Sequence, residues 1–518
     1  MIHLLRFRWV FCQLETLRHC LPPSVRRILA ELPETLDATY ERILQEIPKS
    51  NKVHTHRLLQ CLTVAVRPLR VEELAEVLAI DFGTSDGTPR LNEALRWEDQ
   101  EQAILSACSS LIAIIEIEDF RVVQFSHFSV KEFLTSDRLA TSEADASRYH
   151  HIPLELASTI MAQACLTILL RFDTHTESAI IENFPLAEYA AEHFGDHAEF
   201  EGVLSHVRDE VSHLLDADKP HFAAWLWMSQ SRVNYEHPPP PKVTPLHYVA
   251  ERGYRGLVGY LISKHPEDVN VRGHFGTPLH AALEGGHADV ARLLLEHCVD
   301  VDARDSDDQT PLHLAARRGF LGVSRTLVER HADINARDRF GNTPLIRTRA
   351  IWDNTPEGRG LDVLKFLLEH GADTNATDGN QSTALHVASY HGGVKAARLI
   401  LQHGGNIHAR NRKGQTPLHR VLFGLDDETP SLDRYLDLIR CLLEHGADID
   451  AQDNDNATPL YLASKYGGAK AARLLLGHGA SVHLQDSEGK TPFEVASARG
   501  HESITQLLLG HLQTKQKV

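Results

Sequence analysis

The pattern of apolar and polar positions changes near residue 243. From there to the C-terminus, short apolar runs recur at a nearly constant interval, and each run opens with Thr-Pro-Leu-His or a close variant. Successive openings are 33, 33, 33, 40, 33, 42 and 33 residues apart and begin at Thr244, Thr277, Thr310, Thr343, Thr383, Thr416, Thr458 and Thr491. A fixed period of this length indicates a repeat architecture.

Each repeat predicts two helices joined by a short turn. Thr followed by Pro marks a helix start, because the Thr hydroxyl accepts an otherwise unpaired backbone N–H and Pro has no N–H to lose. A Gly such as Gly319 ends the first helix, and an apolar run such as residues 291–295 forms the second. One repeat cannot bury its own apolar face, so we expect the repeats to stack into a solenoid.

The period, the Thr-Pro-Leu-His opening and the Gly-Ala-Asp-x-Asn-Ala close at 371–376 resemble the ankyrin repeat. Eight units cover residues 243–512, with insertions of 7 residues in repeat four and 9 in repeat six. Both insertions are expected between the paired helices, as two surface fingers that add little to stability. The resemblance implies that this half of the chain binds another protein.

In the ankyrin family, the residues just before the Gly that ends each first helix line the concave side of the solenoid. These positions are mostly cationic or aromatic, and with Trp352 of the first insertion they form the predicted protein-binding set: Arg252, Arg317, Arg318, Tyr390, His391, Lys465, Tyr466, Arg499 and Trp352. Tyr and Arg dominate many interfaces. We therefore predict an acidic or aromatic-rich protein partner.

The recurring histidines raise the question of metal binding, since His is a common ligand. They occur once per repeat, at 247, 280, 313, 386 and 419, and neighbouring repeats lie about 10 Å apart, too far for one zinc ion. We expect them instead to form hydrogen bonds that tie adjacent repeats. Ile346, Tyr461 and Glu494 replace His in repeats four, seven and eight, where weaker stacking is expected.

The first half of the chain has a different pattern. Residues 24–48 predict two short amphipathic helices separated by Pro33, and residues 51–66 predict another. A turn into a helix follows at 67–78 and a further helix at 103–109. Residues 111–117 and 121–125 predict a strand pair that leads into a helix near Ser129. Helices followed by a hairpin indicate a winged helix.

Four runs in this half, beginning at Leu21, Arg67, Phe125 and Pro185, resemble the region downstream of the nucleotide-binding core in fungal NACHT-type proteins of the STAND class. The resemblance spans residues 5–235. In that family an NTPase core controls oligomerisation and ankyrin repeats often form the sensor. The resemblance also implies that His127 contacts a nucleotide phosphate if a nucleotide-binding core is supplied. Without one, we expect His127 to have a structural role beside the strand–helix junction.

This chain departs from the family because it has no Gly-x-x-x-x-Gly-Lys-Ser/Thr loop. Gly489-Lys490-Thr491 has Leu484 where the first Gly is required, so it cannot cradle a phosphate. No catalytic, cofactor or metal residues are predicted, and the chain is not expected to be an enzyme. The alternative is that it is a truncated piece of a nucleotide-regulated STAND NTPase whose catalytic core is missing.

Charge and composition narrow the choice of partners. Residues 1–243 carry −14 of the total charge of −17, which disfavours nucleic acid binding. No apolar run reaches the 18 residues of a membrane span, and seven scattered Cys residues suggest a reducing compartment, so a cytoplasmic location is expected. The acidity either keeps the protein soluble or lets the first half dock intramolecularly on the cationic repeats.

These observations predict a mainly α protein with a helical and winged-helix front half, followed by an eight-unit ankyrin-repeat solenoid. The expected divisions are a helical tail at 1–48, a winged-helix-like domain at 49–140, a helical domain at 141–237, a proline-rich spacer at 238–242 and repeats at 243–512. The predicted function is protein recognition by the sensor or scaffold part of a NACHT-like signalling protein.

Overall fold

The computed structural model of the chain describes most of the sequence, namely residues 35–83, 88–108, 110–117, 120–141, 148–173, 176, 181–216, 218–229, 243–273, 276–348, 360–423, 425–430 and 432–515. The first predicted helix, the proline-rich spacer and Trp352 lie outside these residues. The chain divides into two compact units, residues 1–245 with 254–264, and residues 246–253 with 265–518.

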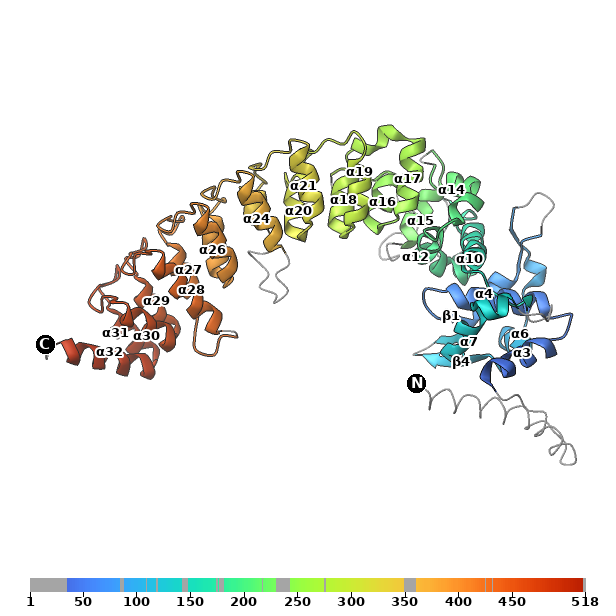
Figure 1. Cartoon of the computed structure of the whole chain (residues 1–518), viewed down its shortest axis with the longest axis horizontal. Helices are drawn as coiled ribbons and strands as arrows, with labels where there is room; N and C mark the ends of the chain where they lie inside the picture. Colours follow the sequence, from blue (N-terminus) through green and yellow to red (C-terminus); the bar gives the residue numbers. More distant parts are fainter. Residues whose placement is uncertain are drawn as a thin grey trace, which may run out of the picture. The chain divides into compact units, whose positions relative to one another are not determined.

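The first unit begins with the predicted winged-helix elements (Figure 1). In chain order they are α3 (Leu36–Glu46), α4 (Lys52–Val64), β1 (Leu69–Arg70), α5 (Val71–Leu78), β2 (Ile80–Asp81), β3 (Arg90–Leu91), η2 (Glu93–Leu95), α6 (Gln100–Cys108), β4 (Ile112–Ile117), β5 (Phe120–Phe125), α7 (Phe128–Leu134) and α8 (Asp137–Ala140). The predicted strand pair is present as β4 and β5, with Ile112 opposite Phe125 and Ile117 opposite Phe120.

A third strand was not predicted from the sequence. β1 pairs antiparallel with β5, so the sheet order is β1-β5-β4. Only Leu69 and Arg70 form β1, and Pro68 precedes them, so the segment is too short for alternation to be visible. Pairing with β5 made it a strand, and this partner is more than fifty residues away in the sequence.

The rest of the first unit is helical: α10 (Leu154–Leu169), α12 (Leu186–Ala198), α13 (Val203–His206), α14 (Arg208–Leu214), α15 (His221–Ser229) and α17 (Arg255–Lys264). Its core contains Trp225, which is 1% exposed and donates its indole N–H to Ala191 O over 2.9 Å. Two carboxylates on α5 are buried but paired: Glu73 accepts from Arg67, and Glu76 accepts from Arg96 and from Leu186 N.

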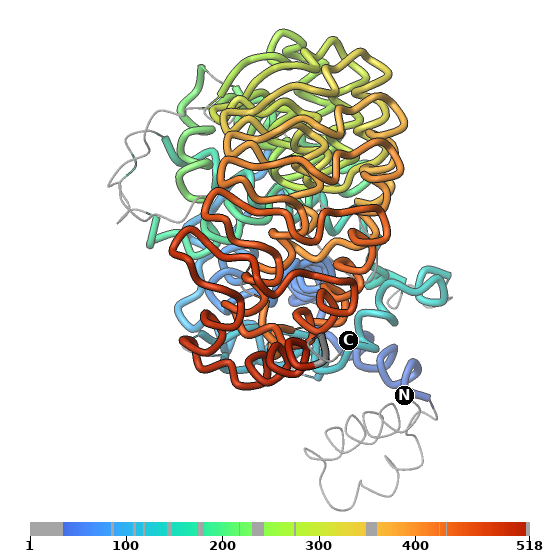
Figure 2. The backbone as a smooth tube through the Cα atoms, turned by 90° about the vertical axis from the view of Figure 1, so that its left-hand side faces the viewer, coloured from blue at the N-terminus to red at the C-terminus, as the bar shows by residue number. Residues whose placement is uncertain are grey.

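The second unit is a series of helix pairs, coloured yellow-green to red in Figure 1 and stacked layer on layer in Figure 2. The first helices are α16 (Pro245–Arg252), α18 (Pro278–Gly285), α20 (Pro311–Arg318), α22 (Pro344–Arg347), α25 (Ala384–Tyr390), α27 (Pro417–Leu422), α29 (Pro459–Tyr466) and α31 (Pro492–Arg499). The second helices of repeats two to eight are α19 (Ala288–Leu295), α21 (Leu321–Glu329), α24 (Leu361–Glu369), α26 (Val394–Gln402), α28 (Leu432–Glu444), α30 (Ala469–Gly477) and α32 (Glu502–Lys515). A short 3-10 helix, η3 (Pro266–Asn270), precedes α18.

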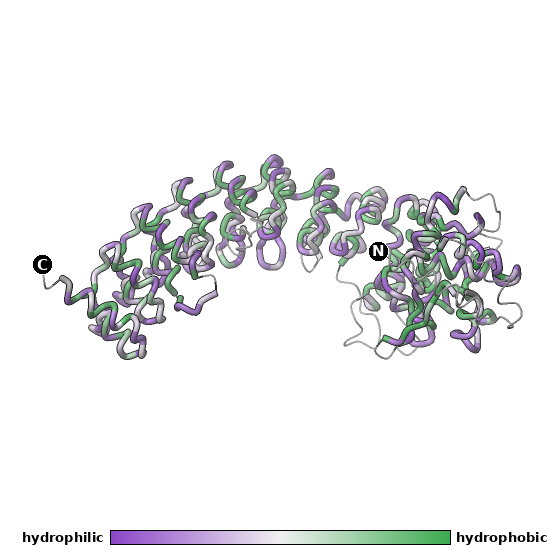
Figure 3. Tube along the Cα trace, turned by 60° about the horizontal axis from the view of Figure 1, so that its bottom comes forward, coloured by the Kyte–Doolittle hydropathy of each residue, from purple (hydrophilic) through white to green (hydrophobic). Residues whose placement is uncertain are grey.

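The helix starts follow the predicted chemistry. The N-cap residue is Thr from repeat two to repeat eight, and its side chain forms a capping box in repeats two, three, five, six and eight. Gly at the C-cap has a positive φ where the first helix must end sharply, as at Gly319 with φ 77°. Figure 3 shows hydrophobic stretches along the helices and hydrophilic loop tips. The predicted fold class, mainly α with an array of helix pairs, is confirmed.

Helix α17 belongs to the first unit although it lies within the first repeat of the sequence. By position it is the second helix of repeat one, yet it packs in the first unit with α12. The carboxylate of Glu199, at the end of α12, accepts the backbone N–H groups of Gly256 and Leu257 over 2.8 and 3.1 Å. An acceptor at this position satisfies unpaired N–H groups in the first turn of α17.

Candidate functional site

The residues predicted to bind a partner lie at the C-terminal ends of the first helices. Arg252, Arg317, Arg318, Lys465 and Arg499 are in the last turns of their helices. Tyr390 ends α25 and His391 is its C-cap. The sequence thus located these positions on the helices correctly, while Trp352 lies outside the described residues.

The recurring histidines hold these helices in place. In repeats two, three, five and six, the backbone N–H of the N-cap Thr donates to His Nδ1 over 3.1–3.2 Å. The Nε2 of the same ring lies 2.9–3.1 Å from a backbone carbonyl oxygen of the next repeat: Gln309, Asn342, Gln415 or Ala457. Because Nδ1 accepts, Nε2 carries the proton and donates. The prediction of ties between adjacent repeats is confirmed.

Burial keeps these histidines neutral. His280, His313, His386 and His419 are 0% exposed. Desolvation lowers the pKa of each, and for His386 the pKa falls to about 4 despite the hydrogen bond to Gln415 O. A protonated ring would lose the acceptor on Nδ1. The tie therefore requires the neutral form.

Where His is replaced, the contacts differ from repeat to repeat. Tyr461 donates its hydroxyl to Asp486 Oδ2 over 2.6 Å, so repeat seven keeps a tie to the next hairpin. Glu494 accepts from the backbone N–H and the hydroxyl of Thr491 within its own repeat. Ile346 has no side-chain polar group for either role.

In repeat three, the predicted cationic residues are already paired with a carboxylate of repeat two. Arg317 donates to Glu284 Oε1 over 2.5 Å, and Arg318 bonds to the Glu284 backbone oxygen and lies 3.4 Å from Oε2. Glu284 comes from the end of α18, one repeat earlier. The sequence places two cations here, but the structure neutralises them with a carboxylate from the neighbouring repeat.

In repeats five to seven, the same helix ends form a continuous surface. The Arg420 guanidinium lies over the rings of Tyr390 and Phe423, with its carbon 4.4 and 5.5 Å from their centroids. The Phe423 ring is 5.3 Å from the Tyr466 ring, and Lys465 Nζ lies 6.0 Å from the latter. We call these five residues the aromatic–cationic row. Tyr390 and Phe423 are 42% and 39% exposed.

Two members of the row, Arg420 and Phe423, were missed from the sequence. Most other helix ends are recognisable by the Gly nine residues after the opening Thr, and repeat six has Leu425 at that position. Counting seven residues from the opening Thr, which reaches Tyr390 from Thr383, also reaches Phe423 from Thr416. Arg420 lies one helical turn earlier in α27 and gave no sequence signal.

The insertion of repeat six is attached to the array rather than standing free as a finger. Leu425 is 3% exposed, and Asp427 Oδ1 accepts the backbone N–H of Lys470 in the first turn of α30 over 3.1 Å. Asp426 is occupied with Thr429 inside the loop. Removal of this loop would take this acceptor away from the start of α30. That the insertion adds little to stability stays a prediction.

His127 has the expected structural role. It is the N-cap of α7, where its Nδ1 accepts from Ser129 N and lies 2.6 Å from Ser129 Oγ. The Ser129 hydroxyl in turn lies 2.9 Å from the Tyr40 hydroxyl of α3. The imidazole therefore joins the strand–helix junction to the first described helix.

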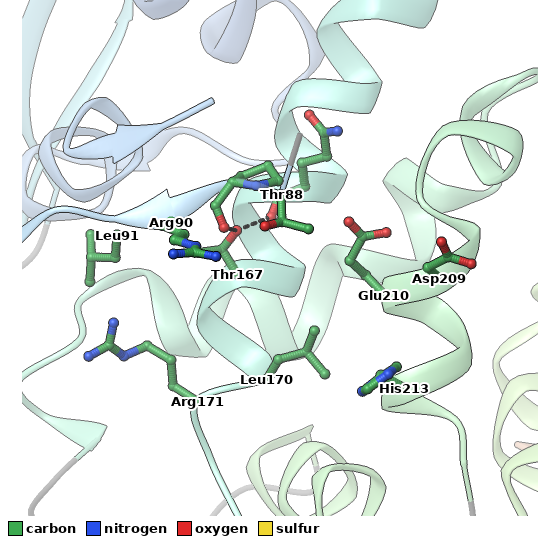
Figure 4. A pocket seen from close by; sticks show the side chains of 11 residues that line it. Thr88, Arg90, Leu91, Thr167, Leu170, Arg171, Asp209, Glu210 and His213 are labelled. Carbon is green, nitrogen blue, oxygen red and sulfur yellow. Dashed lines mark hydrogen bonds between the residues drawn. The ribbon is translucent and has the colours of Figure 1, made fainter. Parts of the chain in front are cut away.

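The first unit also contains a pocket of about 500 Å³ between β3, α10 and α14 (Figure 4). Leu91 and Leu170 contribute apolar lining. Arg90 and Arg171 lie on one side and Asp209 and Glu210 on the other, so charges of both signs line it. Arg171 is also 3.4 Å from Glu93. This balance of charge contrasts with the row and favours no single class of ligand.

The described residues contain no group of three or more His, Cys, Asp or Glu side chains arranged to hold a metal ion. None of the described helices combines the length and the apolar character needed to cross a bilayer.

Comparison with protein families matches two parts of the chain. The model described as ankyrin repeats matches residues 246–338, 355–426 and 431–517, and the model described as the winged helix domain of GPI inositol-deacylase matches residues 40–145. Ankyrin repeats thus form the C-terminal half and a winged-helix domain lies in the N-terminal part. Ankyrin repeats are non-enzymatic interaction modules and imply protein partners.

Among curated proteins, the chain is similar to azaphilone pigments biosynthesis cluster protein L of Monascus ruber, with 30% identity over 297 residues. The match covers 53% of this chain and 61% of that protein. Inversins are similar over 59 residues, with 39% identity in Gallus gallus and 41% in Homo sapiens. These matches cover 11% of this chain but only 5% and 6% of the inversins.

Proposed function

We propose that this chain recognises a partner protein through the C-terminal ends of its first helices, without catalytic activity of its own. The observation that carries the proposal is the aromatic–cationic row, which exposes Tyr390 and Phe423 on consecutive repeats and adds the partly exposed Tyr466 on the next. Exposed aromatic and Arg side chains that lie together are the groups that most often dominate a protein interface. Ordinary surfaces expose large apolar groups singly.

The scaffold supports this proposal. The buried His and Thr ties set the spacing of the helices before any partner arrives, so binding would order few additional groups. Preorganised surfaces lose less conformational entropy on binding and reach higher affinity for the same contacts. The exposed residues at the helix ends then determine which partner fits.

The cellular setting is part of the proposal. The resemblance of residues 5–235 to NACHT-type proteins, together with the winged-helix match at 40–145, supports a sensor or scaffold role in a NACHT-like signalling protein in the cytoplasm. The winged-helix match also favours the second candidate, a part of a nucleotide-regulated STAND NTPase. The reading frame upstream of the Met1 codon distinguishes the two, because an in-frame phosphate-binding loop would support the second.

The test of recognition compares three forms of the full chain as bait. One is unchanged, one has Tyr390, Phe423 and Tyr466 replaced by Ala, and the third has Phe340→Ala. Phe340 is 55% exposed in a repeat hairpin, so it controls for loss of an exposed aromatic ring. We expect a protein captured by the unchanged and Phe340→Ala forms and lost by the triple variant. Equal capture by all three would place the interface elsewhere.

A further inference from the structure

The charges around the aromatic–cationic row point to the chemistry of its partner. Four cations lie on the first helices or at the start of the second helix in repeats six to eight: Arg420, Arg434, Lys465 and Arg499. Across the described residues, none of the four has a carboxylate within ion-pair distance. In repeats two and three, by contrast, Glu284 pairs with both neighbouring arginines. The row therefore carries positive charge that the protein itself does not neutralise.

Two carboxylates of repeats five and six are hydrogen-bonded to backbone groups. Asp378 is close enough to affect Arg420 electrostatically, but its Oδ1 accepts the backbone N–H groups of Asn380 and Ser382 in the hairpin. In the repeat-six insertion, Asp427 caps α30. These carboxylates are tied to the backbone that they support.

Arg420 is also half-buried between two rings. Burial lowers its pKa, and the Arg420 and Arg434 charges, after burial, contribute to lowering the pKa of His391 beside them. Arg434 Nε is buried without a hydrogen-bond partner among the described residues. A half-buried cation without a carboxylate at ion-pair distance is unfavourable, and an incoming carboxylate would relieve that cost.

The dimensions of the row indicate the conformation of its ligand. The row crosses repeats five to seven, which at about 10 Å per repeat spans roughly 20 Å. An extended chain rises about 3.3 Å per residue, so about six or seven residues cover this length, with alternate side chains directed to one face. A helix would need about 13 residues for the same span.

We propose that the row binds an extended acidic segment of a partner protein, with one carboxylate on Arg420 and a second near Lys465. This inference rests on the proposed function and adds the chemical class and conformation of the ligand. It also excludes Arg317 and Arg318 from the site, because Glu284 already occupies them.

The probe is a fluorescent heptapeptide with Glu at alternate positions and Gly between them, and the matched probe has Gln in place of Glu. We expect the acidic peptide to bind the full chain, with anisotropy rising at micromolar to millimolar protein, and the Gln peptide to bind at least about tenfold more weakly. Binding should weaken as salt is raised. Equal binding of the two peptides, or no binding of the acidic one, would overturn the inference.

Variants locate the peptide. Arg420→Ala should weaken binding at least about fivefold, while Arg398→Ala, which removes an exposed charge from α26, should leave it within twofold. Lys465→Ala provides an independent reading if Arg420→Ala disturbs folding, which circular dichroism would reveal. Equal losses in the Arg398 and Lys465 variants would indicate unspecific attraction and contradict the site.

Other outcomes separate this inference from the proposed function. If Arg420→Ala converts a dimer of the chain to a monomer in light scattering, a second copy occupies the row and the acidic-segment proposal is wrong. If the triple aromatic variant loses a protein partner but Arg420→Ala and the acidic peptide have no effect on its capture, recognition stands and the charge argument fails. If no partner depends on the triple aromatic variant, the proposed function itself fails.

Discussion

Repeat three and repeats six and seven all present cations on their first helices, with opposite results. In the former, Arg317 and Arg318 face Glu284 of the preceding repeat. In the latter, Arg420 lies between Tyr390 and Phe423, and Lys465 lies near Tyr466. The helix position provides exposure, but the side chain supplied by the adjacent repeat decides whether a charge is available to a partner. The buried scaffold is the same in both regions.

The largest expected effect is a loss of folding stability at low pH, caused by the buried histidines that both regions share. The folded pKa of each tying His is below the ordinary value of 6.5, so the unfolded chain binds more protons in the window between them. The free energy of unfolding should therefore be unaffected by these histidines above pH 6.5 and should decrease as the pH drops toward 4. His386 alone should account for a decrease of about 3 kcal/mol.

Urea unfolding at several pH values between 7.5 and 4.5 measures this loss. In the His386→Asn variant the dependence on pH should be smaller, because one buried titrating group is removed. An unchanged pH dependence would mean that His386 does not titrate with folding.

The second prediction is that the histidine hydrogen bonds between repeats stabilise the two regions equally. His313→Ala and His386→Ala should each lower the free energy of unfolding by about 2 to 4 kcal/mol, because both leave a buried Thr N–H and a carbonyl of the next repeat unpaired. Denaturation followed by circular dichroism gives both values. A difference greater than about 1 kcal/mol would show that the scaffold is not uniform.

The third prediction separates the regions by binding. Replacing Tyr390 and Tyr466 by Ala should cost at least about 2 kcal/mol of affinity for a captured partner, whereas replacing Arg317 and Arg318 should cost less than about 0.5 kcal/mol. Isothermal titration of the two double variants compares them directly. A larger loss from the arginine pair would reverse the assignment of the site.

The smallest expected effect comes from a substitution that frees Arg317 and Arg318 from their carboxylate, so that their charges become available as those of Arg420 and Lys465 are. Glu284→Gln removes the carboxylate that pairs with both arginines, so affinity for the acidic heptapeptide should rise about threefold, while stability falls by less than about 1 kcal/mol. Glu329→Gln on α21 makes the same charge change at an exposed site without that pairing and serves as control. An equal gain in both variants would reflect net charge alone.

Much of this architecture follows from local sequence. Thr-Pro at each helix start, Gly at most helix ends and a fixed 33-residue period specify helix pairs, because capping and backbone conformation act within a few residues. The same reasoning located Tyr390, Lys465 and Tyr466 at the helix ends. It failed at repeat six, where the Gly used as a reference is absent and Phe423 was overlooked.

The sequence by itself determined the repeat count, the helix starts and the role of the buried histidines, since each depends on a short motif that recurs. Only the tertiary structure decided that β1 is a strand, that Asp427 caps α30 and that Arg420 bridges Tyr390 and Phe423. It also decided that Glu284 neutralises two arginines. These contacts join residues from different repeats or distant segments, and their energies depend on distances that spacing along the chain does not encode.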